Sequence, residues 1–382
     1  MTPITNLNMK KNLIVLALTV ACLMPAQGQT LKEAAAGKFL VGAAVNTDVV
    51  WERDAPAADI VKQHFNSIVA ENCMKGEKIH PEEHRYDWAD ADQTVKFAEE
   101  NGQTVIGHTL VWHSQPPVWM FKDSQGKRVT REVLIDRMYH HITDVVSRYK
   151  GRIKGWDVIN EALNDDGTFR KTPYYEIIGP DYFVLAFQFA HAADPDAELY
   201  YNDYSLDKPA KREGVVRLVK MLKDKGCRVD AVGMQSHCGL EYPNIGDYEK
   251  SIQAFIAAGV RVQFTELDMN VLPNPKGFGG AAIEQNSAYL EQIDPYRKGL
   301  PKKVEKQFNQ RYLDLFGLYK KYADHVNRVT FWGVYDKTSW LNDWPVKGRT
   351  NYPLFFDRNY KAKSVVKEVV KLLTEDAKTT TK

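Results

Sequence analysis

Two short runs decide how this chain folds: Trp156-Asp157-Val158-Ile159-Asn160-Glu161 and Gln263-Phe264-Thr265-Glu266-Leu267-Asp268. Each is an apolar, β-branched stretch, typical of a buried strand, that ends at a glutamate. Other apolar runs follow the same pattern, so that eight strand candidates end near Asn46, Asn72, Trp112, Asn160, Tyr204, His237, Asp268 and Asp336. Eight buried strands are the number that closes a parallel sheet into a barrel.

Amphipathic stretches with helical spacing separate these strand candidates. Clear examples are Ala91–Glu100, Arg131–Tyr149 and Gly214–Lys225. Strands that alternate with helices favour a parallel sheet covered by helices. The predicted fold class is therefore α/β, a single (β/α)8 TIM barrel.

No linker, repeat or composition change interrupts this alternation. We expect one catalytic domain over residues 31–375, followed by a short polar tail at residues 376–382. Two connections are long, Leu272–Val304 and Leu341–Tyr352, and both follow strands. Loops at that end of a barrel shape its binding face, so both are expected to overhang it.

Residues 1–29 have the features of a secretory signal peptide. Met9-Lys10-Lys11 precedes an apolar run at residues 12–21, and small residues follow at Ala26-Gln27-Gly28. The run is shorter than the roughly 20 residues that a membrane-spanning helix needs. We expect a protein that is secreted or periplasmic, with no membrane attachment after cleavage. Translation from Met9 and a lipid anchor on Cys22 remain alternatives, although Thr19 suits lipidation poorly.

The charge balance excludes several classes of partner. Lys and Arg number 51 against 49 Asp and Glu, and removal of the signal segment takes away Lys10 and Lys11, leaving 49 against 49. A chain without net charge has no evident reason to bind nucleic acid, anionic membranes or a strongly charged substrate. We also expect a monomer.

Cysteine usage predicts no disulfide. Outside the signal segment stand Cys73, Cys227 and Cys238, an odd number. In the predicted barrel, no pair of them should reach the Cα spacing of roughly 5.5 Å that a disulfide needs. Three free, mostly buried thiols are expected.

Polar side chains gather where the predicted strands end. Residues an even number apart on a strand share a face, which pairs His108 with Trp112, Gln235 with His237, Glu266 with Asp268, and Trp332 with Asp336. Asn160 and Glu161 are adjacent and would diverge on an ideal strand. We therefore predict a bend or bulge that turns both inward.

Two carboxylates facing each other across a polar cleft can cleave a glycosidic bond. Glu266 has Asp268 beside it and His237 on the preceding strand, and a histidine held between two carboxylates would keep Glu266 ionised as the nucleophile. Glu161 adjoins the neutral Asn160 and lies near tryptophans, where burial favours the protonated form of a general acid. Carboxyl groups about 5–5.5 Å apart give retention, and a gap above roughly 6.5 Å gives inversion.

A series of motifs resembles that of the family 10 glycoside hydrolases, the endo-β-1,4-xylanases, in order and at plausible intervals over residues 42–357. The segments that carry the resemblance are Phe65-Asn66-Ser67, Glu71-Asn72-Cys73-Met74-Lys75, Gly107-His108-Thr109-Leu110-Val111-Trp112-His113-Ser114-Gln115, Trp156-Asp157-Val158-Ile159-Asn160-Glu161-Ala162, Asn202-Asp203-Tyr204, Gln235-Ser236-His237, Thr265-Glu266-Leu267-Asp268, Trp332-Gly333-Val334 and Ser339-Trp340. The resemblance implies a TIM barrel and a retaining mechanism, with Glu161 as acid/base and Glu266 as nucleophile. It implies xylan and xylo-oligosaccharides as substrates and no cofactor.

The resemblance also implies roles for the other polar and aromatic residues. Glu71, Asn72 and Lys75 would hydrogen-bond the second sugar on the non-reducing side of the cut. The sugar at the cut would be lined by His108, Trp112, Asn160, Gln235, His237, Trp332 and Trp340. Asn160 is expected to bond the 2-hydroxyl, while Trp332 and Trp340 would exclude the hydroxymethyl arm of glucose. Asp157, Asp268 and Tyr204 are expected to support these groups.

The chain departs from the family pattern at two positions. Gly76 follows Met74-Lys75 where the family often has tryptophan, and Ser205 follows Tyr204 where asparagine is usual. Neither position touches the expected acid or nucleophile. We interpret both as altered cleft walls, with the loss of one stacking surface near Lys75.

Other interpretations of these residues are structural. His108 and His113 are five apart and should face opposite ways, without a third ligand, so no metal site is expected. His140-His141 should form a solvated pair on a helix, Trp51, Trp88 and Trp119 should serve packing, and Leu354-Phe355-Phe356-Asp357 should close the core. Asp157 could equally be a satisfied buried carboxylate.

Two other functions stay open. The first is a barrel hydrolase of β-1,4-glucan or mannan, against which Lys75, His108 and Trp340 argue together. The second is a sugar-binding protein without catalysis, against which the presence of both glutamates argues. A phosphate-binding barrel isomerase lacks support, because no glycine-rich phosphate cradle follows the seventh or eighth strand.

Overall fold

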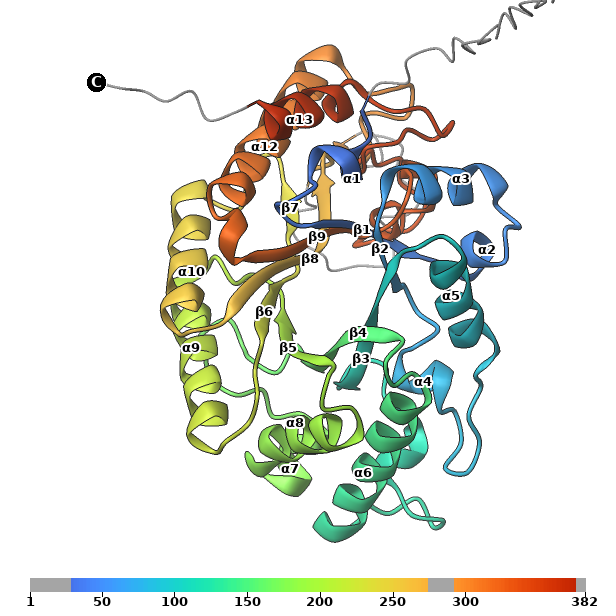
Figure 1. Cartoon of the computed structure of the whole chain (residues 1–382), viewed down its shortest axis with the longest axis vertical. Helices are drawn as coiled ribbons and strands as arrows, with labels where there is room; N and C mark the ends of the chain where they lie inside the picture. The colour runs from blue at the N-terminus through green and yellow to red at the C-terminus, as the bar shows by residue number, and fades with distance from the viewer. Residues whose placement is uncertain (1–28, 274–291, 376–382) are drawn as a thin grey trace, which may run out of the picture.

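Parallel strands form a closed barrel at the centre of the molecule, inside a ring of helices (Figure 1). The computed structural model describes residues 29–273 and 292–375. Residues 1–28 of the expected signal segment lie outside the described residues. The polar tail and most of the Leu272–Val304 connection also lie outside them.

The strands confirm the predicted fold class. They are β1 (Leu40–Val45), β2 (Ser67–Ala70), β3 (Thr104–Trp112), β4 (Ile153–Asn160), β5 (Glu198–Asp203), β6 (Ala231–Met234), β7 (His237–Gly239), β8 (Arg261–Asn270) and β9 (Val326–Phe331). Every pairing between them is parallel, and β6–β8 pairing closes the circle. The sixth barrel strand is interrupted at Gln235-Ser236, where Ser236 has φ 71°. β6 and β7 are therefore two parts of one barrel strand, and both pair with β8.

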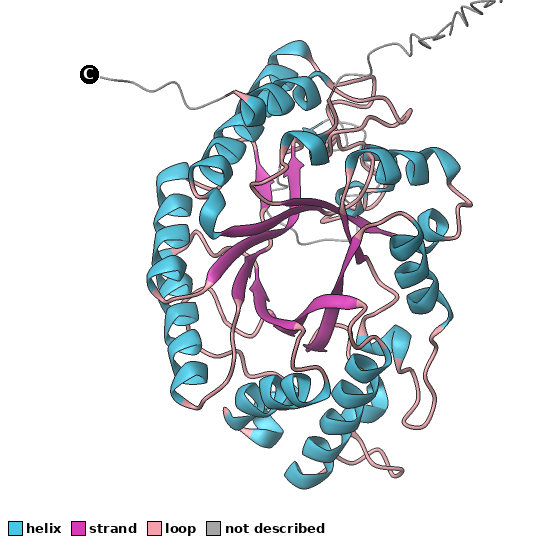
Figure 2. Ribbon diagram, in the orientation of Figure 1, coloured by secondary structure: helices cyan, strands magenta, loops and turns pink. Residues whose placement is uncertain are grey.

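Helices and short helical turns connect successive strands and cover the outside of the barrel (Figure 2). The α-helices are α1 (Leu31–Ala34), α2 (Thr47–Val50), α3 (Ala55–His64), α4 (Gly76–Ile79), α5 (Ala89–Glu100), α6 (Arg131–Arg148), α7 (Pro173–Ile178), α8 (Asp181–Ala193), α9 (Pro209–Asp224), α10 (Ile245–Ala257), α12 (Lys302–Lys321) and α13 (Ser364–Thr374). The 3-10 turns are η1 (Val118–Phe121), η3 (Ala323–His325), η4 (Asp336–Thr338) and η5 (Trp340–Asn342). Within the described residues, none of the helices has the length and apolar character to cross a membrane.

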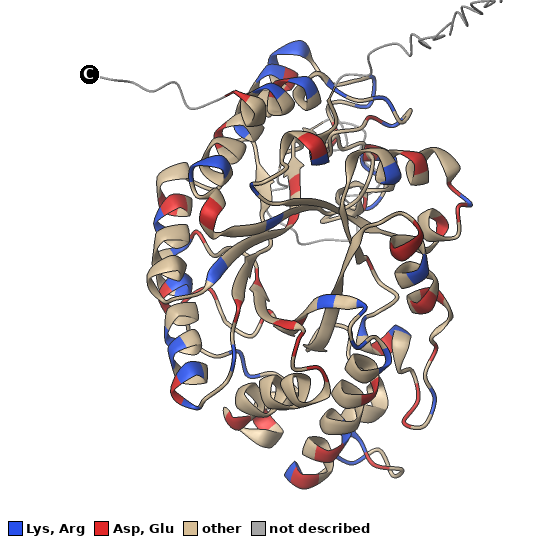
Figure 3. Ribbon diagram, in the orientation of Figure 1, with Lys and Arg blue, Asp and Glu red and all other residues tan. Residues whose placement is uncertain are grey.

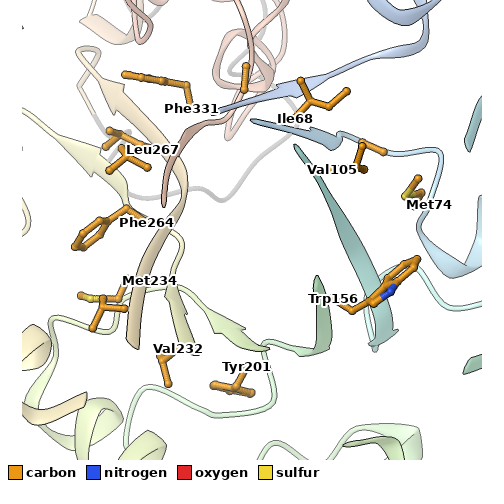
Figure 4. Packing of buried hydrophobic residues seen from close by; sticks show 14 of the residues in the cluster. Ile68, Met74, Val105, Trp156, Tyr201, Val232, Met234, Phe264, Leu267 and Phe331 are labelled. Carbon is orange, nitrogen blue, oxygen red and sulfur yellow. The ribbon is translucent and has the colours of Figure 1, made fainter. Parts of the chain in front are cut away.

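The main hydrophobic core lies between the barrel and the helices. Side chains such as Ile68, Val105, Val232 and Phe264 point outward from their strands (Figure 4) and are fully or almost fully buried. Because helices cover the outer face of the sheet, the strand residues that face outward are largely apolar. This core supports the strand ends that carry the polar residues.

The inside of the barrel is partly polar. Arg328 on β9 is buried there, and its guanidinium donates to Gln263 Oε1 at 3.0 Å and to Thr330 Oγ1 at 2.9 Å. It also lies 3.8 Å from Asp157 Oδ1. A buried charge needs such partners to offset its lost hydration. This group lies beneath the residues described below as the candidate site.

Most charged residues lie on the outer helices and loops, with both signs interspersed (Figure 3). Cys73, Cys227 and Cys238 are free thiols, as predicted. The Leu354–Phe356 segment is buried, also as predicted.

Three structural predictions are wrong. Trp332 and Asp336 do not share a strand face, because β9 ends at Phe331 and Asp336 begins η4. There the buried Asp336 carboxylate binds Lys363 Nζ at 2.8 Å and accepts from the Leu354 amide.

His141 is not part of a solvated pair. It is buried on α6 with its Nδ1 3.1 Å from Nδ1 of His80, whereas His140 is exposed. Burial lowers the pKa of His141 to about 3. Adjacent helical residues differ by about 100°, so one can face the barrel while its neighbour faces solvent.

The three tryptophans assigned to packing lie away from the strand ends that carry the glutamates. Trp88 stacks on Tyr86 at 4.5 Å, and Trp119 donates to the His80 carbonyl at 3.0 Å. Trp51 is 43% exposed and donates to Asp90 at 2.7 Å. Trp51 is therefore a surface residue and not a core residue.

Candidate active site

A cleft of about 690 Å³ opens at the carboxyl ends of the strands. It is lined by Glu71, Asn72, Lys75, His108, Trp112, Ser114, Gln115, Asn160, Glu161, Tyr204, Ser205, Gln235, His237, Glu266, Trp332, Trp340 and Trp344. All twelve residues assigned to catalysis or sugar binding from the sequence are among them, together with Tyr204. Asp157 and Asp268 lie behind this lining and bind its histidines.

Glu266 lies on β8, four residues before the strand ends at Asn270, and its carboxylate is held on both oxygens. His237 Nε2 lies 3.1 Å from Oε2, and Asn202 Nδ2 donates to Oε1 at 2.9 Å. The other ring nitrogen of His237 lies 3.0 Å from Asp268 Oδ1. The structure thus places an imidazole between two carboxylates.

The charges in this group stabilise one ionisation state. Burial alone would lower the pKa of His237, but Asp268 and Glu266 raise it to about 10. Burial alone would raise the pKa of Glu266, but the His237 hydrogen bond, the electrostatic interaction with His108 and the Asn202 hydrogen bond hold it below its usual value. Near neutral pH the group is therefore an imidazolium between two carboxylates, and Glu266 is an anion.

Asn202, the last residue but one of β5, is oriented by residues behind it. The Thr265 hydroxyl donates to Asn202 Oδ1 at 2.6 Å, which turns the Nδ2 group towards Glu266. Gly233 on β6 leaves space for this amide, because a Cβ there would lie 2.3 Å from Asn202 Oδ1. A larger residue at position 233 would displace the donor to Glu266.

Glu161 follows β4 in a different backbone conformation. Its φ is +57°, in the left-handed region. The pairing of β4 with β5 shifts register between Asp157 and Ile159, and the pairing of β4 with β3 shifts register between His108 and Val111. The predicted bend is therefore present. It directs the Glu161 carboxyl group into the same cleft as Glu266.

The donors to Glu161 are neutral. Trp112 Nε1 donates to Oε2 at 2.9 Å, and Gln235 Nε2 donates to Oε1 at 2.9 Å. The side-chain amides of Asn160 and Asn202 lie 2.9 Å apart and connect this group to the Glu266 group. Two glutamates with different partners thus share one polar network.

Lys75 occupies the part of the cleft formed by the residues after β2. Its Nζ donates to Asn72 Oδ1 at 3.0 Å and lies 5.1 Å from the Trp112 ring and 5.9 Å from the Trp332 ring. Burial lowers the pKa of Lys75, although Glu266, Glu71 and Glu161 oppose the shift. Burial likewise raises the pKa of Glu71, and Lys75 opposes it. This part can donate and accept hydrogen bonds at the rim of a bound ring.

His108 and Trp340 are held by carboxylates beneath the cleft. His108 Nδ1 lies 2.9 Å from Asp157 Oδ2, which gives Asp157 the supporting position left open by the sequence. Trp340 Nε1 donates to Asp268 Oδ2 at 2.7 Å, so that Asp268 binds both His237 and Trp340. Asp157 and Asp268 therefore orient residues that line the cleft.

Several residues at this site were not singled out by the sequence reasoning. The motifs contain Asn202 and Thr265 but do not indicate a role for either residue, and Trp344 lies outside the motifs. Trp344 is 60% exposed and stacks on Trp340 with ring centroids 6.3 Å apart. Its position on the expected overhanging Leu341–Tyr352 loop was the available signal. In the described part of the chain, no group of three or more His, Cys, Asp or Glu side chains is arranged to hold a metal ion.

An anionic glutamate and a second glutamate held by neutral donors, in a cleft walled by indoles, can break a bond between sugars. The sequence model of glycosyl hydrolase family 10 matches residues 30–372. The chain belongs to glycosyl hydrolase family 10. Among curated relatives, endo-1,4-beta-xylanase A of Xylanibacter ruminicola is 65% identical over 348 residues, which cover 91% of this chain and 94% of the relative.

Solved structures agree with the family assignment. The structure of a GH10 endoxylanase from a sugarcane soil metagenome has a TM-score of 0.85 and 41% identity, over 90% of this chain and 99% of that one. A mutant structure in complex with xylotriose has a TM-score of 0.80 and 31% identity, over 90% and 99% of the two chains. Glycosyl hydrolase family 10 therefore accounts for the fold and nearly the whole described length.

Proposed function

We propose that the chain is a secreted, retaining endo-1,4-β-xylanase that hydrolyses internal xylosidic bonds of xylan, with Glu266 as nucleophile and Glu161 as acid/base. Relatives named endo-1,4-beta-xylanase support the activity, at 65% and 39% identity for those of Xylanibacter ruminicola and Paenibacillus barcinonensis. The observation that carries the proposal is the unequal environment of the two glutamates. The Glu266 carboxylate contacts an imidazolium, while Glu161 receives hydrogen bonds from Trp112 and Gln235.

In the first step, a Glu266 oxygen attacks the anomeric carbon while the bond to the leaving sugar oxygen breaks. Glu161 gives its proton to that oxygen, and a glycosyl ester on Glu266 results. In the second step, Glu161 takes a proton from water as the water oxygen attacks the same carbon and the ester bond breaks. Two inversions restore the original configuration, and both residues return to their starting states.

The cleft chemistry suits a pentose polymer. A xylose ring has hydroxyls on its rim and apolar C–H faces, which fit amide, imidazole and ammonium groups at the edge and indoles above or below. Asn72 and Lys75 provide such rim groups for the neighbouring sugar, while Trp332 and Trp340 provide the indoles. We assign to Asn160 the hydrogen bond to the 2-hydroxyl at the cut, and to the two indoles the exclusion of a hydroxymethyl arm.

The test is product analysis with linear xylan, arabinoxylan and carboxymethyl cellulose. We expect short xylo-oligosaccharides from both xylans and no release from the cellulose derivative. Proton NMR during hydrolysis should show the β-anomer first, before mutarotation. Early appearance of the α-anomer would exclude double displacement, and preferred cleavage of the cellulose derivative would favour the glucanase alternative.

Export and oligomeric state are part of the proposal. Expression of the full chain in a bacterial host should yield a protein that has lost residues up to about position 29 and that behaves as a monomer in light scattering. N-terminal sequencing and cell fractionation check the cleavage. Membrane recovery that disappears in Cys22→Ala would instead indicate a lipid anchor.

A further inference from the structure

We infer that Arg170 is a positioning residue for Glu161, acting through the backbone that carries the acid/base and not through contact with the sugar. The inference rests on the role proposed for Glu161. Arg170 lies nine residues further along the chain, and a narrow hairpin returns it to the end of β4. Leu163 and Phe169 form a bridge in this hairpin, and the Asn164 amide donates to the Thr168 carbonyl at 2.9 Å.

The backbone after β4 needs external support. A non-glycine residue in the left-handed region is disfavoured because its Cβ approaches backbone atoms too closely, and Glu161 has φ +57°. This conformation persists only where the surroundings hold it. The support is therefore visible in the partners of residues 161–163.

Arg170 binds all three carbonyls of this turn. Its Nε donates to the Glu161 carbonyl at 3.0 Å, and its Nη2 donates to the Leu163 carbonyl at 3.1 Å. Its own backbone amide donates to the Ala162 carbonyl at 2.8 Å. The fork of a guanidinium can hold two carbonyls in fixed directions, which a lysine cannot reproduce.

The amides of the same turn are held from β5. Glu161 donates to the Asn202 carbonyl at 2.9 Å, and Ala162 donates to the Tyr201 hydroxyl at 3.1 Å. Arg170 Nη2 also donates to the Tyr204 hydroxyl at 2.8 Å. Arg170 therefore joins the backbone of Glu161 to Tyr204, a residue of the cleft wall.

Arg170 itself is half-buried behind Glu161 and is not among the residues that line the cleft. A change there should move the Glu161 carboxyl group without removing a sugar contact. A displacement of about 1 Å at a catalytic group can cost on the order of 100-fold in rate. The loss of rate should appear only on substrates whose leaving group needs a proton from Glu161.

The experiment compares two substrates with Arg170→Met and Arg170→Lys. On xylohexaose, whose leaving group needs a proton, kcat/KM of Arg170→Met should fall by about 10- to 100-fold. On 2,4-dinitrophenyl β-xylobioside, whose leaving group needs none, kcat/KM should change little. Arg170→Lys should lie between Arg170→Met and the wild type on xylohexaose.

Arg217→Met is the matched control. Arg217 Nη2 donates to the Gly167 carbonyl at 3.0 Å, so it supports the same hairpin without touching Glu161. It should leave the ratio of the two kcat/KM values unchanged. Circular dichroism and thermal unfolding show whether each variant is folded.

Three outcomes would overturn the inference. Equal losses on both substrates in folded Arg170 variants would indicate a structural role only, and a raised KM on both with normal kcat would indicate sugar contact. The same substrate selectivity in Arg217→Met would assign the effect to the hairpin in general. Glu161→Ala is measured beside them, because absence of the selectivity in that variant would contradict the proposed function itself.

Discussion

The two halves of the cleft hold their glutamates by different means. Glu266 stands on the long strand β8, is almost fully buried, and is held by an ion pair with His237, which Asp268 also binds. Glu161 follows a strand that has shifted register, has left-handed backbone geometry, and receives hydrogen bonds from neutral side chains. Charge therefore stabilises one ionisation state in the first half, whereas the side chains that donate to the carboxyl group in the second half, Trp112 and Gln235, are neutral.

The roles proposed for the two glutamates account for this difference. A nucleophile has to be an anion before substrate arrives, so opposite charge beside it helps. An acid/base has to be protonated in one step and ionised in the next, so a fixed cation close to its carboxyl group would hinder it. Substitutions in the two halves of the cleft test this contrast.

Glu266→Ala should remove turnover of xylan by more than about 10⁴-fold, because no other group can form the glycosyl ester. Xylo-oligosaccharide binding should persist, since the rim residues and indoles remain. Initial rates and calorimetric titration with xylohexaose measure the two effects. Substantial remaining turnover in a preparation free of wild type would remove Glu266 from the mechanism.

Glu161→Ala should reduce cleavage of xylan by about 10²–10⁴-fold, the usual contribution of a general acid. The first step on activated aryl xylosides should be spared, because their leaving groups depart without a proton. Pre-steady-state release of dinitrophenol measures this step. A loss of similar size on both substrates would refute the assignment and erase the contrast between the halves.

His237→Gln should lower kcat on xylan by about 10- to 100-fold, because the two carboxylates lose their shared cation. It should also change how stability varies with pH. The pKa of His237 is raised to about 10 in the folded protein, from about 6.5 when unfolded. Its contribution to the free energy of unfolding is therefore complete below about pH 6.5 and is lost as pH rises through about 10.

Denaturant unfolding from pH 6 to pH 10 measures this contribution. The difference between wild type and His237→Gln should be largest near pH 6 and should narrow steadily towards pH 10. A constant difference would mean that His237 is not an imidazolium in the folded protein. Charge would then not be the means by which the Glu266 half is held.

Gly233→Ala should reduce kcat by about 10-fold, because the added methyl group would displace Asn202 and its hydrogen bond to Glu266. The control is Gly317→Ala on α12, where an added Cβ meets nothing within 4 Å. It should leave kcat unchanged. Normal kcat in Gly233→Ala would show that the ion pair alone orients Glu266.

Trp344→Ala should have the smallest effect. Its indole is exposed and stacks on Trp340, whose Nε1 donates to Asp268. Loss of the Trp344 indole should raise KM for long xylo-oligosaccharides by roughly fivefold, about 1 kcal/mol, with little change in kcat. A series from xylotriose to xylohexaose locates the affected sugar. A change in kcat for every length would instead show that Trp344 supports the position of Trp340.

The sequence by itself determined the barrel and the members of the site. Alternating apolar and amphipathic stretches predict eight barrel strands, because each buried strand carries its own hydrophobic pattern. Glu161, His237, Glu266 and Asp268 could be assigned to one cleft because parallel strands end on the same side of a barrel. The bend at Asn160 followed from two adjacent polar residues that both had to face inward.

Only the tertiary structure decided the contacts that depend on which strands and loops approach one another. The local sequence pattern could not show that Thr265 and Gly233 together orient Asn202. It also could not show that β9 ends before Trp332, or that His141 on α6 contacts His80, which follows α4. Nor could it show Arg170 reaching the carbonyls of Glu161 and Leu163. Hydrophobic periodicity is local and can be read residue by residue, whereas a hydrogen bond between separate strands or loops depends on the register and bulges that arise when the barrel closes.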